Sequence, residues 1–160
     1  MPTPTSLRTA LLALCLSGTP ALADLSGYAI VRDDATLRVK GRTIHLYGIH
    51  IPPTGSSCRP LQRPPRCTSR AALALEFKKG ANFVHCEPRQ DHADRTLTAI
   101  CRVKGEDLAA YLLERGWALA LPEAPFEYHA LEKIARHRGL GIWGIPLDNV
   151  PRPRRRTDED

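Results

Sequence analysis

Two stretches of alternating residues meet at one tight turn, and this pattern restricts the fold of the chain more than any other. Apolar and polar residues alternate in ATLRVK before the turn and in RTIHLYGI after it. Lys40 and Gly41 between them are typical of a tight turn. Alternation with a period of two places the apolar side chains on one face of a strand. The sequence therefore predicts an antiparallel hairpin with Leu37 and Ile44 on its buried face.

Eight elements are expected along the chain, and their order suggests a fold class. Short stretches rich in strand-forming residues alternate with two-faced helical stretches. The expected strands cover residues 27–32, 35–40, 42–49, 82–88 and 96–103, and the expected helices cover 68–80, 106–116 and 126–139. Five short strands with a helix between the third and the fourth are the order of an OB-fold barrel. We therefore expect a mainly β protein with helices, in which a five-stranded OB-fold barrel and three α-helices form a single domain.

The first helix carries start and stop signals in its sequence. Thr68 or Ser69 is expected to cap its first turn, and Gly80 is expected to end it after two lysines. Leu73 and Phe77 are four residues apart, so they are expected to share one apolar stripe.

The two ends of the chain are expected to lie outside the folded domain. Residues 1–23 have the three parts of a secretory signal peptide, which are the charge of Arg8, the apolar core ALLALCLSG and a final ALA. That core is too short to span a bilayer. We expect an exported protein, periplasmic or secreted, with no membrane association after cleavage. The domain would then span residues 25–150, and the charged segment 151–160 (PRPRRRTDED) is expected to be disordered.

Cysteine usage agrees with export. Removal of residues 1–23 would take away Cys15 and leave an even number, namely Cys58, Cys67, Cys86 and Cys101. An even number in an exported chain favours disulfides, and the spacings match no zinc pattern. Three pairings are possible in principle. Proximity along the chain favours Cys58–Cys67 and Cys86–Cys101.

Four segments together carry a resemblance to a known family. They are DDATLRVKGRTIHLYGIHIPP, CTSRAALAL, VHCEPRQDHADRTLTAICRVKGEDLAAYLLERGWALA and YHALEKIARHRGLGIW, in this order and spacing. Over about residues 27–143 the chain resembles the thermonuclease family (staphylococcal-nuclease-like domains), particularly its small secreted bacterial members. The resemblance implies an OB-fold barrel with three helices. It also implies calcium-dependent endonuclease chemistry, with acidic metal ligands, a carboxylate that activates water and two arginines that hold the phosphate.

The first family motif, Asp-Gly-Asp-Thr, loses its metal ligand in this chain. Aligned on Thr36, the motif falls on Asp33, Asp34, Ala35 and Thr36. The second Asp of the motif, a direct calcium ligand in the family, is therefore Ala35 here. Alanine offers no oxygen ligand, and calcium requires oxygen.

The other family motifs are also altered. In the run Arg-Leu-x-Gly-Ile-Asp-x-Pro-Glu, the first arginine is His45, the second calcium ligand is His50 and the catalytic glutamate is Pro53. The third motif, Tyr-Gly-Arg, retains only its arginine, Arg95. A family tyrosine that packs on substrate corresponds to Leu121. Proline has no ionisable group, so it cannot replace the glutamate as a general base.

The resemblance thus implies a catalytically degenerate, thermonuclease-like (SNase-like) protein, a pseudoenzyme that uses no cofactor. It would act as a weak, non-specific binding module for DNA, RNA or another anionic ligand, through Arg95, Lys40 and Arg42. The enzyme question stays open, because a phosphodiester-cleaving nuclease with a rebuilt metal site is the alternative. Its speculative transition-metal ligands are Asp33, Asp34, His45 and His50.

A basic surface is the second candidate for contact with nucleic acid. Without residues 1–23 the chain keeps 22 of its 23 Lys and Arg residues and all 17 Asp and Glu residues, for a formal net charge of +5. The candidate surface comprises Lys40, Arg42, Arg59, Arg63, Arg66, Arg70, Lys78 and Lys79. An ordinary solvated surface is the alternative, because only 6% of residues are aromatic and OB-folds that bind single strands use exposed aromatic rings.

Overall fold

The computed structural model of the protein describes residues 24–53, 57–59 and 66–144. The expected signal peptide (1–23) and the expected tail (151–160) lie outside the described residues. Within the described ranges, no helix is long and apolar enough to cross a bilayer.

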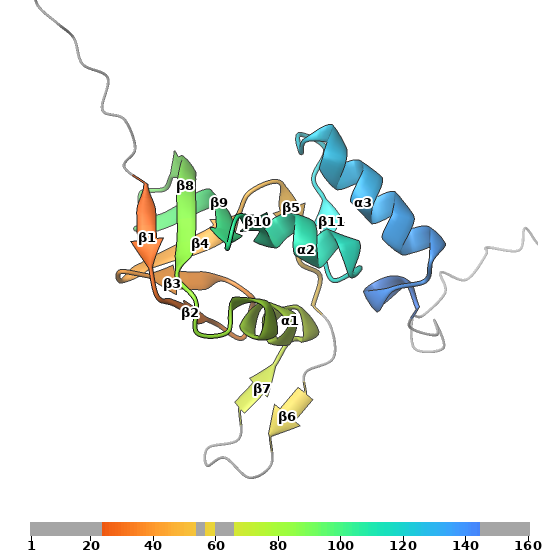
Figure 1. Ribbon diagram of the computed structural model, residues 1–160, viewed down its shortest axis with the longest axis horizontal. Coiled ribbons are helices and arrows are strands. Elements are labelled where there is room, and N and C mark those ends of the chain that lie inside the picture. The colour runs from red at the N-terminus through yellow and green to blue at the C-terminus, as the bar shows by residue number, and fades with distance from the viewer. Residues whose placement is uncertain (1–23, 54–56, 60–65, 145–160) are drawn as a thin grey trace, which may run out of the picture.

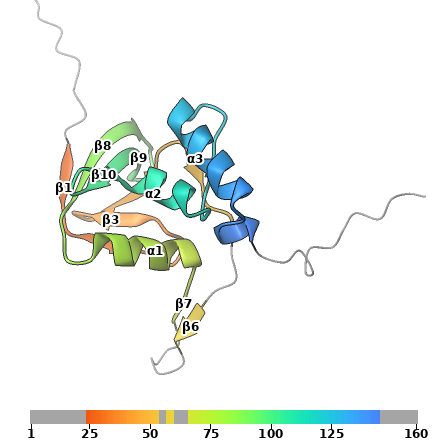
Figure 2. The same cartoon turned by 45° about the vertical axis from the view of Figure 1, so that its right-hand side comes forward.

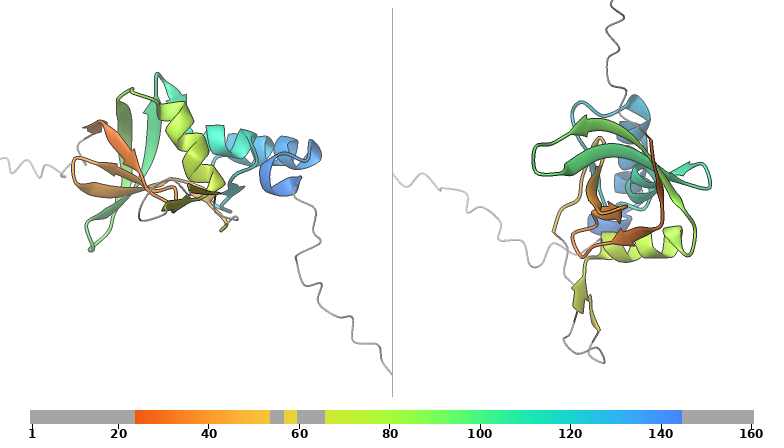
Figure 3. Two further views of the ribbon diagram at one scale, coloured as in Figure 1. Left: turned by 90° about the horizontal axis from the view of Figure 1, so that it is seen from below. Right: turned by 90° about the vertical axis from the view of Figure 1, so that its left-hand side faces the viewer.

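The main sheet closes almost completely on itself. Its strands are β1 (Leu25–Gly27), β2 (Ala29–Val31), β3 (Leu37–Val39), β4 (Arg42–Leu46), β8 (Val84–Asp91) and β9 (Thr96–Val103). They pair in the order β1-β8-β9-β4-β3-β2, and β10 (Glu106–Asp107) pairs with β9. β1 and β2 are at opposite ends of this strand order, but only Tyr28 separates them in the sequence. The sheet therefore curves until its first and last strands are adjacent. The result is a nearly closed barrel (Figure 1), which the right-hand view of Figure 3 shows end-on.

The strand count differs from the five that the sequence predicts. The main sheet of the described residues has seven strands, because the expected strand 27–32 is divided at Tyr28 and the short β10 is added. The division has a physical reason. A strand that closes a barrel has to pair on both sides, and here β1 pairs with β8 while β2 pairs with β3. The observed class is mixed α/β, with a barrel-like sheet and three α-helices in the described part of the chain.

Two small strand pairs lie outside the barrel. The expected strand 42–49 is interrupted at Gly48, which has a φ of 72°, and β5 (Ile49–His50) then pairs with β11 (Leu119–Ala120). The expected strands include none between residues 50 and 68, but the structure has a further pair there, β6 (Ser57–Arg59) and β7 (Arg66–Thr68). The set of expected strands was therefore incomplete, since cross-strand pairing satisfies the backbone of these residues.

Two of the three helices of the described residues, α1 (Arg70–Lys79) and α2 (Leu108–Glu114), contact the barrel, and the third, α3 (Phe126–His137), packs on α2 (Figure 1). The short 3₁₀ helix η1 (Gly141–Trp143) follows α3. Figure 2 shows α1 below the barrel and α3 packed beside α2. Ser69 caps α1 through a hydrogen bond from the Ala72 N–H at 3.1 Å, and Gly80 ends it with a φ of 53°. Both signals were correctly identified in the sequence.

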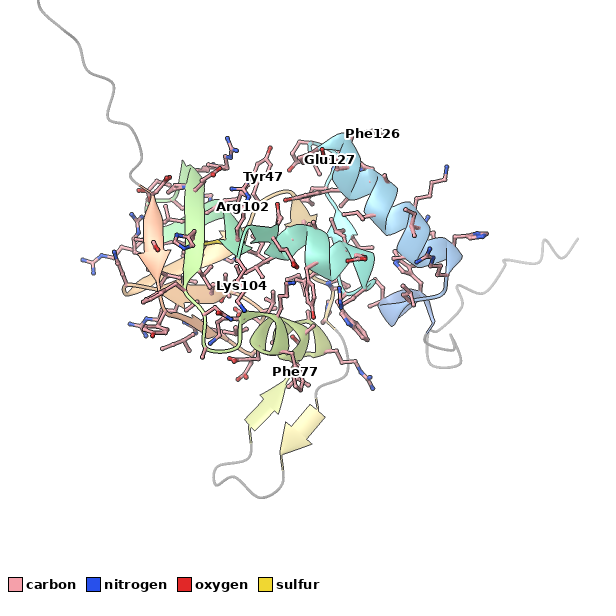
Figure 4. All side chains as sticks on the ribbon, viewed as in Figure 1. Tyr47, Phe77, Arg102, Lys104, Phe126 and Glu127 are labelled. Atoms are coloured by element: carbon pink, nitrogen blue, oxygen red, sulfur yellow. A yellow bond between two sulfur atoms is a disulfide. The ribbon has the colours of Figure 1, made fainter. Side chains whose placement is uncertain are left out.

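The apolar stripe expected on α1 was wrong, because Leu73 is only half-buried and lies off the buried face of the helix. Phe77 is 85% exposed, whereas Ala71, Ala72 and Leu75 are fully buried. The helix therefore turns two alanines and a leucine toward the core, on a different face from the expected stripe. Phe77 points away from the fold (Figure 4).

The core extends from the barrel to the buried faces of the helices, and its strand residues confirm the hairpin pattern. Leu37, Val39 and Ile44 have no exposed surface, and Leu46 is 6% exposed. Arg38, which alternates with the first two, is exposed. The period of two in the sequence thus assigned the inner and outer faces of β3 and β4 correctly.

The barrel interior also holds one of the two expected disulfides. Cys86 of β8 and Cys101 of β9 are direct partners across the ladder, with Cα atoms 4.0 Å apart, and they form a disulfide. This pairing is confirmed. The backbone of Cys58 is opposite that of Cys67 in the β6–β7 pair. The side chains of both residues lie outside the described part of the chain, so the Cys58–Cys67 bond stays a prediction.

Candidate functional site

A small pocket opens at the barrel surface where the first two family motifs meet. It has a volume of about 210 Å³ and lies between the loop after β2 and the segment from β4 to β5. It contains four of the residues singled out in the sequence: Asp34, Ala35, His45 and His50. Its lining comprises Asp34, Ala35, Thr36, His45, Leu46, Ile49, His50 and Ile51. Two other expected site residues, Pro53 and Arg95, do not line it.

The loop on one side of the pocket is held by Asp34. Its Oδ1 accepts hydrogen bonds from the Thr36 N–H at 3.0 Å and from the Thr36 hydroxyl at 2.7 Å. Partial burial alone would raise the pKa of Asp34, but these two bonds and the charge of Arg32 lower that pKa below its ordinary value. Asp34 is therefore a charged residue that stabilises the turn, and its Oδ1 already accepts two hydrogen bonds from Thr36.

Ala35, which the resemblance aligns with a calcium ligand, has an unusual backbone conformation. Its φ is 62°, in the left-handed region that few residues other than glycine, Asn and Asp adopt. Its side chain is only 1% exposed. The methyl group thus forms part of the pocket wall, where it offers no ligand to a cation.

The third motif forms a second turn with the same construction. Asp94 Oδ1 accepts from the Thr96 N–H at 3.1 Å and from the Thr96 hydroxyl at 2.6 Å, and Arg95 between them has a φ of 65°. The bonds from Thr96 lower the pKa of Asp94. Sequence reasoning missed this likeness, although the signal was present as Asp-x-Thr at both loops.

Arg95 extends from this second turn at the start of β9. The parallel register places Thr43 beside Thr96 and His45 beside Thr98, so Arg95 lies about 10 Å along the strands from His45. Asp91 and Asp94 are near Arg95 in the sequence, and an ion pair with either would compete with phosphate for its guanidinium group. Asp91 instead pairs with Arg42 at 2.5 Å, and no carboxylate of the described residues pairs with Arg95.

The two pocket histidines are both exposed. His45 lies beside Thr98, whose hydroxyl is 2.9 Å from Nε2 of a third histidine, His92. His50 lies in β5, opposite Leu119. In the described ranges, no group of three or more His, Cys, Asp or Glu residues is placed to hold a metal ion. The structure therefore does not gather Asp33, Asp34, His45 and His50 into a ligand set.

Three cations of the expected basic surface pair with neighbouring carboxylates. Arg42 pairs with Asp91, Lys78 pairs with Glu106, and Lys79 lies 3.8 Å from Glu76. Arg70 lies over the ring of Trp117, 5.9 Å from its centroid. The side chains of Arg59, Arg63 and Arg66 lie outside the described part of the chain. Of the described members of this set, Lys40 alone has neither a carboxylate nor an aromatic ring as a partner among the described residues.

Exposed aromatic side chains are the feature that sequence reasoning overlooked. Tyr28 is 66% exposed and Phe83 is 52% exposed, and their ring centroids are 4.3 Å apart. Leu121, in place of the family tyrosine, is half-buried and donates its N–H to Gly48 at 2.9 Å. The available signal was the pair Tyr28 and Ile30, two apolar residues at a spacing of two in a strand whose other face is buried.

Comparison with known proteins adds no identification. A scan of the chain against protein-family models finds no match, and a search of the curated proteins finds no significant match.

Proposed function

We propose that this protein is an exported thermonuclease-like OB-fold protein whose active site is degenerate, and that it binds nucleic acid weakly and without sequence preference. One observation carries the proposal. The pocket is lined by Ala35, His45 and His50, and the resemblance aligns Ala35 and His50 with the two calcium ligands of the family and His45 with one of its arginines.

The arrangement of the barrel supports the OB-fold part of the proposal. If β1 and β2 are taken as one strand, five strands surround the core, and α1 joins the third to the fourth. This is the arrangement of a five-stranded Greek-key barrel of the OB type. Such barrels commonly bind oligonucleotides on one face.

The chemistry of the pocket favours binding over hydrolysis. Phosphodiester hydrolysis needs a base for the attacking water and a cation that offsets charge on the phosphoryl oxygens. The only carboxylate that lines the pocket among the described residues is Asp34, and its Oδ1 is engaged by Thr36. Loss of a general base typically lowers the rate by about 10²–10⁴-fold.

A digestion series tests the catalytic half of the proposal. Mature protein from a nuclease-deficient host is incubated with plasmid DNA and single-stranded RNA, in calcium, zinc or chelator. We expect no calcium-stimulated cleavage above background. Calcium-stimulated cleavage that disappears in Arg95→Ala would contradict the proposal.

One observation favours the alternative of an active nuclease. Asp34, His45 and His50 line the same pocket, and two imidazoles with one carboxylate are a ligand set that suits a transition metal. Cleavage that requires zinc, and that His50→Ala abolishes, would identify this rebuilt site.

A binding measurement tests the other half. Affinity for labelled DNA and RNA is measured at several salt concentrations, because phosphate contacts release counterions and make binding salt-dependent. We expect measurable binding at low salt that weakens as salt rises. Arg95→Ala should weaken it more than Arg138→Ala, a matched loss of one exposed arginine at the end of α3. Binding that is absent at low salt, or insensitive to salt, would contradict the proposal.

A further inference from the structure

The outer surface of β2 and β3, together with the residues just before β2 and β8, combines exposed aromatic rings with cationic side chains. Tyr28 and Phe83 lie one step beyond the paired residues Gly27 and Val84, and their rings are in contact with an interplanar angle of 36°. Both are more than half exposed. Ile30, two residues after Tyr28 and on the same face, is 65% exposed. Large apolar side chains grouped on a surface commonly mark an interaction site.

Cations alternate with these apolar groups across the ladder. Arg38 of β3 is the direct partner of Ile30. Lys40 follows two residues later, and its side-chain carbons lie within 3.7 Å of where a Cβ on Gly27 would be. Both cations are exposed, and neither forms an ion pair with a carboxylate of the described residues. The face thus presents flat rings beside exposed positive charge.

The face continues toward the pocket at Ala35. A shallow hollow of about 350 Å³ is lined by residues 30–34, from Ile30 to Asp34. Asp34 also lines the pocket that contains His45 and His50. Arg32 stands in the hollow and lowers the pKa of Asp34 by its charge. A flexible chain could therefore follow one continuous track from the rings to the pocket.

We propose that this face, formed by Tyr28, Phe83, Ile30, Arg38 and Lys40, binds single-stranded nucleic acid. Bases stack on the Tyr28–Phe83 pair, and Arg38 and Lys40 contact phosphates. Flat rings interleaved with cations suit a polymer that alternates aromatic bases with negative charge. A duplex keeps its bases inside its own stack, so it reaches only the cations. This assignment rests on the proposed binding function and identifies the preferred ligand and its surface.

The test measures the affinities of the native protein, of variants of this face and of a control variant by fluorescence anisotropy. The ligands are a labelled oligothymidylate and a hairpin duplex. Tyr28→Ala with Phe83→Ala should lower affinity for the single strand roughly tenfold or more, because base stacking is lost. The same variant should change duplex affinity less than about twofold. Phe126→Ala removes an aromatic ring that is 85% exposed on α3 and should leave both affinities unchanged (Figure 4).

A second variant separates stacking from folding and from general hydrophobicity. Tyr28→Leu with Phe83→Leu keeps apolar bulk but removes the ring faces. This variant should lose the preference for single strands, and its urea unfolding midpoint should equal that of the native protein. Arg38→Ala with Lys40→Ala should reduce the slope of log affinity against log salt by about 0.7 for each phosphate group that these two side chains neutralise.

The outcomes distinguish this inference from the function on which it rests. A native protein that binds neither ligand overturns both. A native protein that binds the single strand, with unchanged affinity in both aromatic double variants, overturns only the assignment of this face. Vesicles of phosphatidylcholine and phosphatidylglycerol are the third ligand. Binding to them that the same variants abolish, without oligonucleotide binding, would assign the face to a membrane and overturn the proposal.

Discussion

At the scale of single residues, two Asp-x-Thr turns define the loops beside the candidate site. In each, an aspartate oxygen accepts two hydrogen bonds from the threonine, and the residue between them has a positive φ. The central residues are Ala35 and Arg95, which have no conformational preference for this region. The bonds therefore hold a backbone shape that the central residues alone would not adopt.

Thr36→Val tests this role, because valine has nearly the same shape and lacks the hydroxyl. We expect the free energy of unfolding at pH 7 to fall by about 1 kcal/mol, as a hydrogen bond to Asp34 is lost. Urea denaturation measures the change. Thr43→Val is the control, because the Thr43 hydroxyl has no hydrogen bond to a described residue, and it should be close to neutral.

The effect should depend on pH in a defined direction. The pKa of Asp34 is lower in the folded protein than its ordinary value of 3.8, so the unfolded chain binds the proton more readily. The resulting stabilisation is present above about pH 4 and is lost as the pH falls through the lowered pKa. The difference between the native protein and Thr36→Val should therefore be largest at neutral pH and shrink in stronger acid. A difference that grows in acid would contradict the role of the Asp34 carboxylate.

At the scale of elements, Asp107 joins two helices. Its Oδ1 accepts from the N–H groups of Ala109 and Ala110 and so caps α2. Its Oδ2 accepts from the Tyr128 hydroxyl of α3 at 2.6 Å. Burial of Tyr128, together with this bond, raises the pKa of its hydroxyl far above the ordinary value, so the hydroxyl stays a donor at all moderate pH. One carboxylate therefore fixes both the start of α2 and the position of α3.

Tyr128→Phe should lower the free energy of unfolding by about 2 kcal/mol, because the bond it removes ends on a charged group. The ring still fills its site, which is only 3% exposed, and the α2 cap remains. Thermal and urea unfolding measure the change. Tyr111→Phe is the matched control, since the Tyr111 hydroxyl has no hydrogen bond to a described residue. Equal losses in the two variants would show that Asp107 does not join the helices energetically.

At the scale of the whole molecule, the disulfide ties together the two longest strands of the barrel. Cys86 and Cys101 are 15 residues apart in sequence and almost fully buried. Closing a loop of this length stabilises a folded protein by about 3 kcal/mol in the chain-entropy description. A domain of this size has a total stability of about 5–15 kcal/mol. The bond is therefore a large share of the stability of the barrel, and it requires an oxidising compartment to form.

Replacement of both cysteines should measure the contribution of the Cys86–Cys101 disulfide to the free energy of unfolding. Cys86→Ala with Cys101→Ala is expected to lower the free energy of unfolding by about 3 kcal/mol or more, since the buried sulfur atoms are also lost. Cys86→Ser with Cys101→Ser gives a second measurement with closer side-chain volume. A reducing agent should destabilise the native protein more than either variant, because the variants keep only the predicted Cys58–Cys67 bond. Variants as stable as the native protein would contradict a structural role for the bond.

The sequence by itself determined the inner and outer faces of β3 and β4, the limits of α1 and the Cys86–Cys101 pairing. These depend on local periodicity, on capping residues and on short separations, all of which are visible in a linear chain. It did not determine that residues 25–31 divide at Tyr28, that Phe77 is exposed, or that Arg42, Lys78 and Lys79 are paired with carboxylates. It also did not show that Tyr28 meets Phe83. These features depend on which distant segments the closed barrel brings together, and no local pattern encodes the register at which a barrel closes.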